Sequence, residues 1–270
     1  ACFAHKGFEV IGVDVVKETV AKINNGESPI PEPGVDKLIK RHKSRITATD
    51  DGKSAVLNTG ASFVIVPTPS NSDGSFSIKY VVEACGPIGH GLAQKKGYHL
   101  VVITSTVLPG DMDKIQLVLE KVSKKKCGKD FGLCYSPDFI AIGQIVKDFL
   151  NPDMILIGQS DPSAGRCLEE IHRQVADNDP SIHRMSFQSA ELTKIGLNSF
   201  VTMKISFANV IAEICENIPG GDAEAVCKAI GSDTRVGNKY FRGGLAYGGP
   251  CFCRDNRAFN VAAKRAGKKA

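Results

Sequence analysis

The sequence lacks the features that mark several large classes of protein. None of its nine cysteines forms a Cys-x-x-Cys pair, so neither a disulfide scaffold nor a zinc site is predicted, and we expect no bound metal. No apolar run approaches the roughly 20 residues that span a bilayer. The opening residues, ACFAHKGFEV, do not have the pattern of a signal peptide. Together these absences favour a reducing, cytoplasmic setting.

Aromatic residues are also scarce, at 7% of the chain, although the net charge is +5. The basic residues are dispersed apart from two short clusters, Lys124–Lys126 and Lys264–Lys269. Nucleic-acid-binding surfaces concentrate basic side chains and interleave aromatic ones among them. We therefore expect a partner that is neither a nucleic acid nor a membrane.

What the sequence does contain is a series of short apolar runs, each closed by a proline, a glycine or a small polar residue. Segments with helical periodicity, such as Asp111–Lys124, separate them. Strands that alternate with helices predict an α/β fold, a Rossmann-like doubly wound parallel sheet. The predicted strands lie within Phe8–Asp14, Ala61–Ser70, His99–Gly110, Gly132–Phe139 and Asp153–Ser160.

The amino-acid composition of the chain changes near residue 188. From Ser189 to Ile218 the sequence is rich in helix formers, contains no proline and is apolar enough to be buried on more than one face. Short helices around the glycine-rich segment RGGLAYGGPCF are expected after it. We predict a dinucleotide-binding domain over residues 1–188 and an all-α domain over 189–270, with a long spine helix.

Three residues at the ends of predicted strands are candidates for ligand binding. An acid at the position of Asp14 binds the adenosine ribose hydroxyls in dinucleotide folds and favours NAD over NADP. Thr68 and Thr106 stand where strands pass into loops, the edge at which open α/β sheets bind ligands. For the two threonines, a structural role as helix caps or turn residues is the alternative. The glycine-rich loop that accompanies such an acid is expected upstream of Ala1.

Lys194 and Asn198 are four residues apart on the predicted spine helix, so they share one face. A cation and an amide that project together from an apolar helix can stabilise a developing alkoxide. The alternative is that Lys194 forms a surface ion pair with Glu191, one turn earlier.

Cys251 carries the strongest signal, in the stretch YGGPCFCRDN. The glycines before it permit a tight bend, and Arg254 supplies a positive charge that favours the thiolate. Asp255 is placed to orient a water or a base. This context favours a nucleophile over the small apolar core residue that most cysteines are.

These motifs, in this order, resemble the UDP-glucose/GDP-mannose dehydrogenase family of nucleotide-sugar dehydrogenases. The resemblance runs through GFEVIGVD, VPTPS, STVLPG, YSPDFIAIG, ELTKIGLNSF and YGGPCFCRDN, and covers nearly the whole chain. It implies oxidation of the C6 alcohol of a nucleotide sugar, such as UDP-glucose, to a carboxylate with two NAD⁺. It also implies a homodimer formed through the spine helices and a further C-terminal nucleotide-binding domain.

The resemblance implies a role for each matching residue. Cys251 would form the thiohemiacetal and thioester, and Lys194 and Asn198 would stabilise the oxyanions. The other implied roles are catalytic water binding by Asp255 and Thr106, thioester hydrolysis by Asp138, cofactor binding by Asp14, Thr68 and Ser105, and substrate binding by Tyr247, Gly248 and Arg235.

Three positions depart from the family pattern. Asp138 stands in place of a glutamate and is one methylene shorter, Ile142 stands where many members have a second glutamate, and Cys253 replaces a proline. Two other functions therefore stay open. One is a one-step dehydrogenase of the β-hydroxyacid type, which also carries a Lys-x-x-x-Asn pair, and the other is a non-catalytic nucleotide-binding or dimerisation protein.

Overall fold

The computed structural model describes residues 1–269, which form two compact units. The first unit contains Ala1–Pro69 and Ser77–Glu191, and the second contains Ser70–Phe76 and the chain from Leu192 onward. The assignment of Ser70–Phe76 to the second unit is unexpected, because this segment lies in the sequence between two elements of the first.

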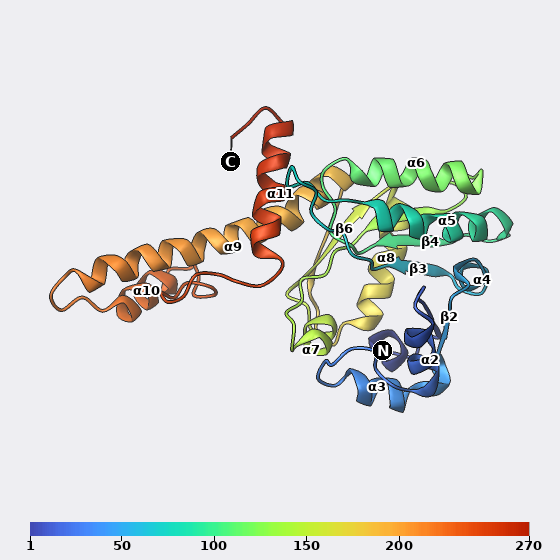
Figure 1. Ribbon diagram of the computed structural model, residues 1–270, viewed down its shortest axis with the longest axis horizontal. Coiled ribbons are helices and arrows are strands. Elements are labelled where there is room, and N and C mark those ends of the chain that lie inside the picture. The colour runs from blue at the N-terminus through green and yellow to red at the C-terminus, as the bar shows by residue number, and fades with distance from the viewer. Residues whose placement is uncertain (270) are drawn as a thin grey trace. The chain divides into compact units, whose positions relative to one another are not determined.

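The first unit is built around two sheets (Figure 1). A two-stranded sheet has the order β1-β2, and a five-stranded sheet has the order β3-β4-β5-β6-β7. The strands are β1 (Val10–Val13), β2 (Ile46–Thr49), β3 (Ala61–Val64), β4 (Leu100–Ile103), β5 (Gly132–Tyr135), β6 (Met154–Gln159) and β7 (Ser181–Met185). The helices are α1 (Cys2–His5), α2 (Lys17–Asn25), α3 (Val35–Arg41), α4 (Gly52–Leu57), α5 (Lys79–Gln94), α6 (Asp111–Ser123), α7 (Ile145–Leu150) and α8 (Pro162–Val175), with the short 3₁₀ helix η1 (Lys43–Arg45).

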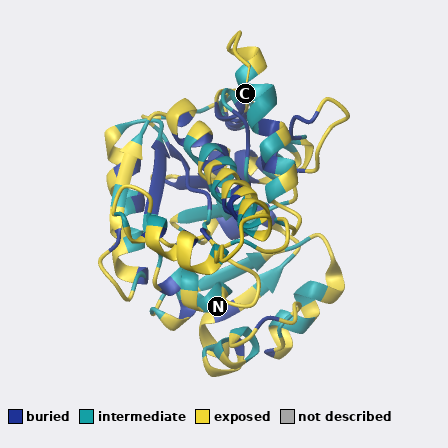
Figure 2. Cartoon of the chain, turned by 90° about the vertical axis from the view of Figure 1, so that its left-hand side faces the viewer, coloured by how far each residue is buried: buried dark blue, intermediate teal, exposed yellow. Residues whose placement is uncertain are grey.

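The central strands β4 and β5 are buried at every position, as Figure 2 shows in dark blue. Residues of β4 alternate between two apolar clusters, with Val101 and Ile103 in one and Leu100 and Val102 in the other. Side chains of α5 and α6 complete the first cluster, and side chains of α8 complete the second. The predicted sheet with helices on both faces is thus confirmed.

The sheet departs from the predicted parallel pairing at one pair of strands. β5 and β6 pair antiparallel, with Cys134 opposite Gln159, whereas the other pairs in both sheets are parallel. The chain between β5 and β6 runs through the loop that contains Asp138 and through the short helix α7. Strand β6 then runs antiparallel beside β5. Strands β2 and β7 were not predicted, because their sequences, ITAT and SIHRM, are short and mix polar with apolar residues.

Close packing of α5 depends on glycine. A Cβ on Gly91 would lie 2.6 Å from Cβ of Val56 in α4, and one on Gly89 would lie 2.6 Å from Cγ1 of Val122 in α6. Real carbon atoms do not approach to this distance, so the two glycines set how near α4 and α6 lie to α5.

Gly91→Ala is expected to destabilise the first unit, because the added methyl group meets Val56 and the carbonyl oxygen of Lys53, which is 3.1 Å away. Overpacking of this kind costs about 1–3 kcal/mol. Thermal or urea unfolding would measure it. His90→Ala, at the exposed neighbouring position of α5, is the control and should change stability by less than about 0.5 kcal/mol. Equal stability of Gly91→Ala and wild type would contradict the packing argument.

The second unit is helical, with α9 (Phe187–Glu216) entering it at Leu192, followed by α10 (Ala223–Ser232) and α11 (Phe252–Arg265). Ala208 and Ile211 of α9 form a small core with Cys227 of α10 and with Phe241. The ammonium group of Lys204 donates to the carbonyl oxygens of Val236, Gly237 and Lys239 at 2.7–3.0 Å. These bonds fix the start of the loop that leads to Cys251.

An adjoining face of α9 exposes a regular row of large apolar side chains, so the helix is not buried on every side in the single chain. They recur at intervals of three and four residues, the spacing of a heptad repeat. The row consists of Phe200, Met203, Phe207, Val210 and Ile214, each between 48% and 56% exposed.

By length and composition α9 is also able to cross a membrane. An 18-residue window of it has a mean hydropathy of 1.3, and 22% of that window is buried. The sequence contains no uninterrupted apolar run of roughly 20 residues, but α9 meets the criteria of length and mean hydropathy. Lys204 and the core residues of α9 contact the rest of the second unit.

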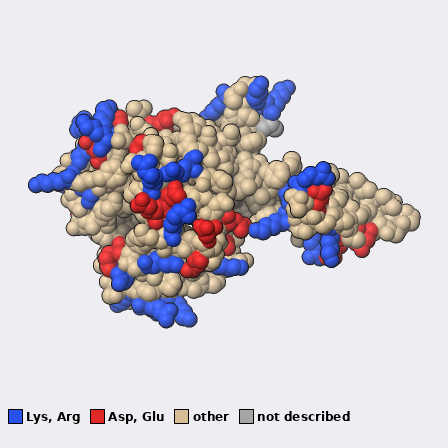
Figure 3. Space-filling view, turned by 180° about the vertical axis from the view of Figure 1, so that it is seen from behind, with Lys and Arg blue, Asp and Glu red and all other residues tan. Residues whose placement is uncertain are grey.

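Charged side chains of both signs are intermixed on the face drawn in Figure 3, where Lys and Arg lie beside Asp and Glu over much of the surface. The chain forms surface ion pairs such as Lys40–Asp36 at 2.6 Å and Arg173–Glu169 at 3.0 Å. Exposed pairs of this kind add little stability, about 0–1 kcal/mol each.

Candidate active site

Cys251 lies at the N-cap position of α11, and its side chain is exposed. Its carbonyl oxygen accepts a hydrogen bond of 2.8 Å from the N–H of Asp255, which closes the first turn of the helix. Gly249, two residues earlier, has φ +80°, a conformation that favours glycine. The exposure excludes a role as core filler. The side chain thus stands at the N-terminal end of a helix, where the helix dipole is positive.

Asp255 is 1% exposed and lies at the centre of a polar cluster between α9 and α11. One carboxylate oxygen, Oδ2, accepts a hydrogen bond of 2.6 Å from Nδ2 of Asn198. The other, Oδ1, accepts one of 3.2 Å from Nε of Arg254. The structure therefore brings together Asn198 and Asp255, two residues that the sequence analysis selected from motifs 57 residues apart.

Lys194 is 9% exposed and lies one helical turn before Asn198 on α9. The alternative of a surface ion pair with Glu191 is wrong, because Glu191 is fully buried. Its carboxylate accepts hydrogen bonds from the backbone N–H groups of Gly110, at 2.9 Å, and Met112, at 2.8 Å. Glu191 thus caps the N-terminus of α6, a role that sequence spacing did not suggest.

Burial raises the pKa of Glu191 to about 7, with the neighbouring Asp111 and Asp113 adding to the rise, although the two N–H donors oppose it. The ordinary value is 4.5, so the folded protein binds this proton more tightly than the unfolded chain does. The folding stability that Glu191 contributes is fully present below its ordinary pKa of 4.5. It is lost as the pH rises through its pKa in the folded protein, about 7.

Glu191→Gln is expected to remove this part of the pH dependence, because an amide does not titrate. The stability of wild type relative to the variant should fall between pH 5 and pH 8, as measured by urea unfolding at each pH. Glu213→Gln, at an exposed position of the same helix, is the control and should follow the wild-type profile. Parallel profiles for wild type and Glu191→Gln would contradict the assignment.

Ser105, Thr68 and Thr106 lie together in the first unit, where β3 and β4 end. Thr68 Oγ1 donates to the carbonyl oxygen of Thr106 at 2.9 Å. Ser105 Oγ accepts from the N–H of Val66 and donates to its carbonyl oxygen, both at 2.8 Å. These bonds join the two loops at the carboxyl edge of neighbouring strands, where ligands of α/β sheets bind.

Asp14 follows β1, the strand of the two-stranded sheet. Its Oδ1 accepts a hydrogen bond of 2.8 Å from the N–H of Val16, which forms a tight turn into α2. The next residue, Val15, is 92% exposed, and Ile65, directly after β3, is 68% exposed. An acid and exposed apolar side chains at strand ends fit the ribose and the adenine of a dinucleotide.

Asp138 lies in the loop between β5 and α7, beside a cavity of about 40 Å³. In the same cavity His172 Nε2 lies 3.2 Å from Ser136 Oγ, and burial lowers the pKa of His172 to about 4, so it is neutral. The far end of this loop is held by Glu32, whose carboxylate accepts from the N–H groups of Gly143 at 3.2 Å and Ile145 at 3.0 Å. The sequence analysis missed Glu32, because its partners are more than 100 residues away in the chain.

The predicted substrate residues lie in the second unit. The ring of Tyr247 packs edge-on against Phe252, and its hydroxyl accepts from Nδ2 of Asn256 at 3.3 Å. Gly248 has open space where a Cβ would be. The guanidinium of Arg235 binds the carboxylate of Asp233 at 2.6 Å, and its side chain is 87% exposed.

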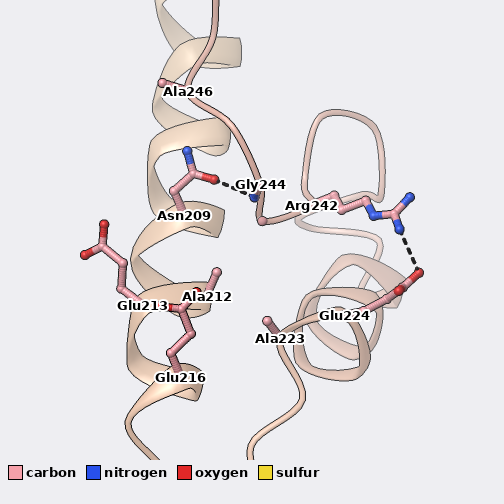
Figure 4. Close-up of a pocket in the computed structure, with 10 residues that line it drawn as sticks. Asn209, Ala212, Glu213, Glu216, Ala223, Glu224, Arg242, Gly244 and Ala246 are labelled. Carbon is pink, nitrogen blue, oxygen red and sulfur yellow. Dashed lines mark hydrogen bonds and ion pairs between the residues drawn. The ribbon is translucent and has the colours of Figure 1, made fainter.

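An open groove of about 600 Å³ lies between α9, α10 and the first half of the glycine-rich loop (Figure 4). Asn209 of α9 accepts a hydrogen bond of 3.0 Å from the N–H of Gly244, and Arg242 pairs with Glu224 at 3.4 Å. Glu213 and Glu216 add negative charge along α9. The sequence analysis did not identify this groove.

Comparison with known proteins identifies the family of both parts of the chain. Residues 1–176 match the NAD binding domain of the UDP-glucose/GDP-mannose dehydrogenase family, and residues 188–270 match its central domain. The first unit is therefore an NAD-binding domain, and NAD is its cofactor.

Two curated relatives align over almost the whole chain. UDP-glucose 6-dehydrogenase AglM of Haloferax volcanii is 37% identical over 99% of this chain, and GDP-mannose 6-dehydrogenase of Pseudomonas aeruginosa is 37% identical over 98%. The chain spans 63% and 61% of the length of these two relatives.

The structural comparison gives the same result. A UDP-glucose dehydrogenase from Pyrobaculum islandicum has a TM-score of 0.90 and 34% identity, with 99% of this chain and 61% of that one covered. A GDP-mannose dehydrogenase from Pseudomonas aeruginosa has a TM-score of 0.81 and 36% identity, with 99% and 62% covered. The chain belongs to the UDP-glucose/GDP-mannose dehydrogenase family.

Proposed function

We propose that this protein is a nucleotide-sugar 6-dehydrogenase that oxidises the C6 alcohol of UDP-glucose to a carboxylate. NAD⁺, when bound to the first unit, would supply the hydride acceptor for each of the two oxidations that this requires. The names of the relatives, which include both UDP-glucose and GDP-mannose 6-dehydrogenases, support the reaction class.

The observation that carries the proposal is an exposed thiol, that of Cys251, at the N-terminus of α11, four residues before the buried Asp255–Asn198 pair. Its sulfur would add to the aldehyde carbon, with the proton passing to the aldehyde oxygen, to give a thiohemiacetal. Transfer of a hydride from that carbon to NAD⁺, with loss of the hydroxyl proton, would give a thioester. Water then releases the acid and returns the thiol.

The surrounding residues have distinct roles in this scheme. Lys194, buried on the same helix as Asn198, would stabilise the alkoxide that forms at C6. Asn198 would hold Asp255 through the 2.6 Å bond and donate its second N–H to the oxyanion. Asp255 and Thr106 would bind the hydrolytic water, and Asp138 would assist the hydrolysis of the thioester.

Substrate and cofactor would be held by the remaining predicted residues. Asp14 would bind the adenosine ribose, and Thr68 and Ser105 would fix the loops that contact the cofactor. For the nucleotide sugar, Tyr247, Gly248 and Arg235 are the proposed contacts, and the exposed guanidinium of Arg235 suits a phosphate.

We propose further that the protein is a homodimer in which the apolar row on α9 pairs with the same row of a second copy. The heptad spacing of Phe200, Met203, Phe207, Val210 and Ile214 supports this arrangement, because such a row is complementary to itself about a two-fold axis.

The reaction class is tested by counting NADH per sugar consumed, with UDP-glucose and GDP-mannose each supplied as the only substrate. A nucleotide-sugar 6-dehydrogenase yields two NADH and a carboxylate. One NADH and an aldehyde would instead identify the β-hydroxyacid type of enzyme. Turnover of GDP-mannose without UDP-glucose turnover would retain the reaction and reject the proposed substrate.

A further inference from the structure

The segment Ser70–Phe76 is a small hairpin whose turn is fixed by several hydrogen bonds. Ser70 and Phe76 pair as an antiparallel bridge, and the N–H of Asn71 donates to the carbonyl oxygen of Ser75 at 2.8 Å. The carboxylate of Asp73 accepts from both the N–H and the hydroxyl of Ser75, at 2.9 and 2.6 Å. Gly74 has φ +86°, which favours glycine. The hairpin is therefore a defined structure rather than a loose loop.

This hairpin lies against α11, the helix that begins after Cys251. A Cβ on Gly74 would be 3.4 Å from Cβ of Arg257 and 3.6 Å from Cγ2 of Val261. Phe76 is 5% exposed. The hairpin and α11 both belong to the second unit, so their packing is internal to that unit.

Phe76 contacts the side chain that holds Asp255. The guanidinium carbon of Arg254 lies 4.6 Å from the centroid of the Phe76 ring, within the range of a cation–π interaction. Nε of the same guanidinium donates to Oδ1 of Asp255, whose Oδ2 accepts from Asn198. A continuous series of contacts thus runs from the hairpin through α11 to α9.

The planar geometry of the Arg254 guanidinium explains how its contact with the Phe76 ring can affect Asp255. The donors of a guanidinium are fixed in one plane, so a ring that restrains the plane also restrains where Nε points. The Arg254 side chain is 27% exposed, and the Phe76 ring packed against its guanidinium reduces the rotamers open to it. Asp255, at 1% exposure, has little water to replace a lost N–H donor.

We infer that Phe76 is a positioning residue for the active site: its ring restrains the Arg254 guanidinium and thereby fixes the orientation of the Asp255 carboxylate. The kinetic consequence rests on the proposed function, in which Asp255 binds the hydrolytic water. The structural consequence, an ordered Arg254 side chain, does not depend on it.

The test compares Phe76→Leu, which retains apolar volume but lacks a ring, with Phe76→Tyr, which retains the ring. The direct readout is solvent exchange of the Arg254 Nε–H, followed by NMR with ¹⁵N-arginine and assigned by its loss in Arg254→Lys. We expect exchange to rise about tenfold in Phe76→Leu and to stay within about twofold of wild type in Phe76→Tyr. Phe241→Leu, which removes a ring of similar burial elsewhere in the second unit, should leave this resonance unchanged.

Kinetics give a second, independent readout. The kcat for acid formation should fall about tenfold in Phe76→Leu with little change in KM for NAD, and Phe76→Tyr should restore it. Unchanged Nε–H exchange in Phe76→Leu overturns the inference, as does an equal loss in both Phe76 variants, which would indicate a purely steric role. If wild type oxidises no nucleotide sugar, the proposed function fails, and the exchange measurement still decides the role of Phe76.

Discussion

Cys251→Ser is expected to lower acid formation by at least about 10³-fold while nucleotide-sugar binding is retained. A serine hydroxyl is a far weaker nucleophile than a thiol, so the aldehyde is not captured as a covalent adduct. The first oxidation needs no nucleophile and should continue to produce NADH. Single-turnover measurements should therefore show one NADH per active site in the variant and two in wild type.

Peptide mass spectrometry checks the covalent step directly. Wild type incubated with the sugar aldehyde and NAD should gain the mass of the sugar nucleotide on the tryptic peptide that contains Cys251, and Cys251→Ser should not. Cys253→Ser is a matched control, because Cys253 is also exposed and lies two residues away on α11. Its activity should stay within about threefold of wild type. Full acid formation by Cys251→Ser would remove the covalent mechanism from the proposal.

The elements that could be predicted are those whose own residues have a clear strand or helix pattern. Buried strands such as β4 have no polar residue in their four positions and are recognisable without their neighbours. The helix α9 was evident from its length and composition, and its predicted start at Ser189 is two residues from the observed Phe187. The weak strand β7 has a largely exposed surface, so its pattern does not differ from that of a loop.

Features that depend on distant parts of the chain were not predictable. Glu32 caps a helix 113 residues away, and Glu191 caps one 79 residues away, and nothing near either residue in the sequence specifies its partner. The hairpin that carries Phe76 has an ordinary turn sequence, SNSDGS, and its packing on α11 arises only in the folded protein. Asn198 and Asp255 could be selected as candidate site residues from the sequence, because each lies in a short motif whose residue types indicate a chemical role. The structure shows that they are hydrogen-bonded to each other.

Phe207→Asp is expected to convert the proposed homodimer into a monomer at micromolar concentration. Phe207 lies in the middle of the apolar row and is 56% exposed in the single chain. Each buried phenylalanine contributes about 1.5–3 kcal/mol, and a two-fold interface contains the residue twice. The substitution also places two carboxylates, one from each copy, where they would be desolvated together. Sedimentation equilibrium of both proteins would measure the change in mass.

Leu117→Asp provides the matched control, because Leu117 is 65% exposed on α6 in the first unit and lies outside the row. It should leave the dimer intact, which separates loss of the interface from a general effect of added charge. A wild-type monomer would contradict the dimer proposal. If that monomer also bound phosphatidylcholine vesicles and Phe207→Asp did not, the row on α9 would be a membrane contact, which its hydropathy permits. We expect no vesicle binding, because in a dimer the apolar row of each copy is covered by the row of the other copy and is not exposed to lipid.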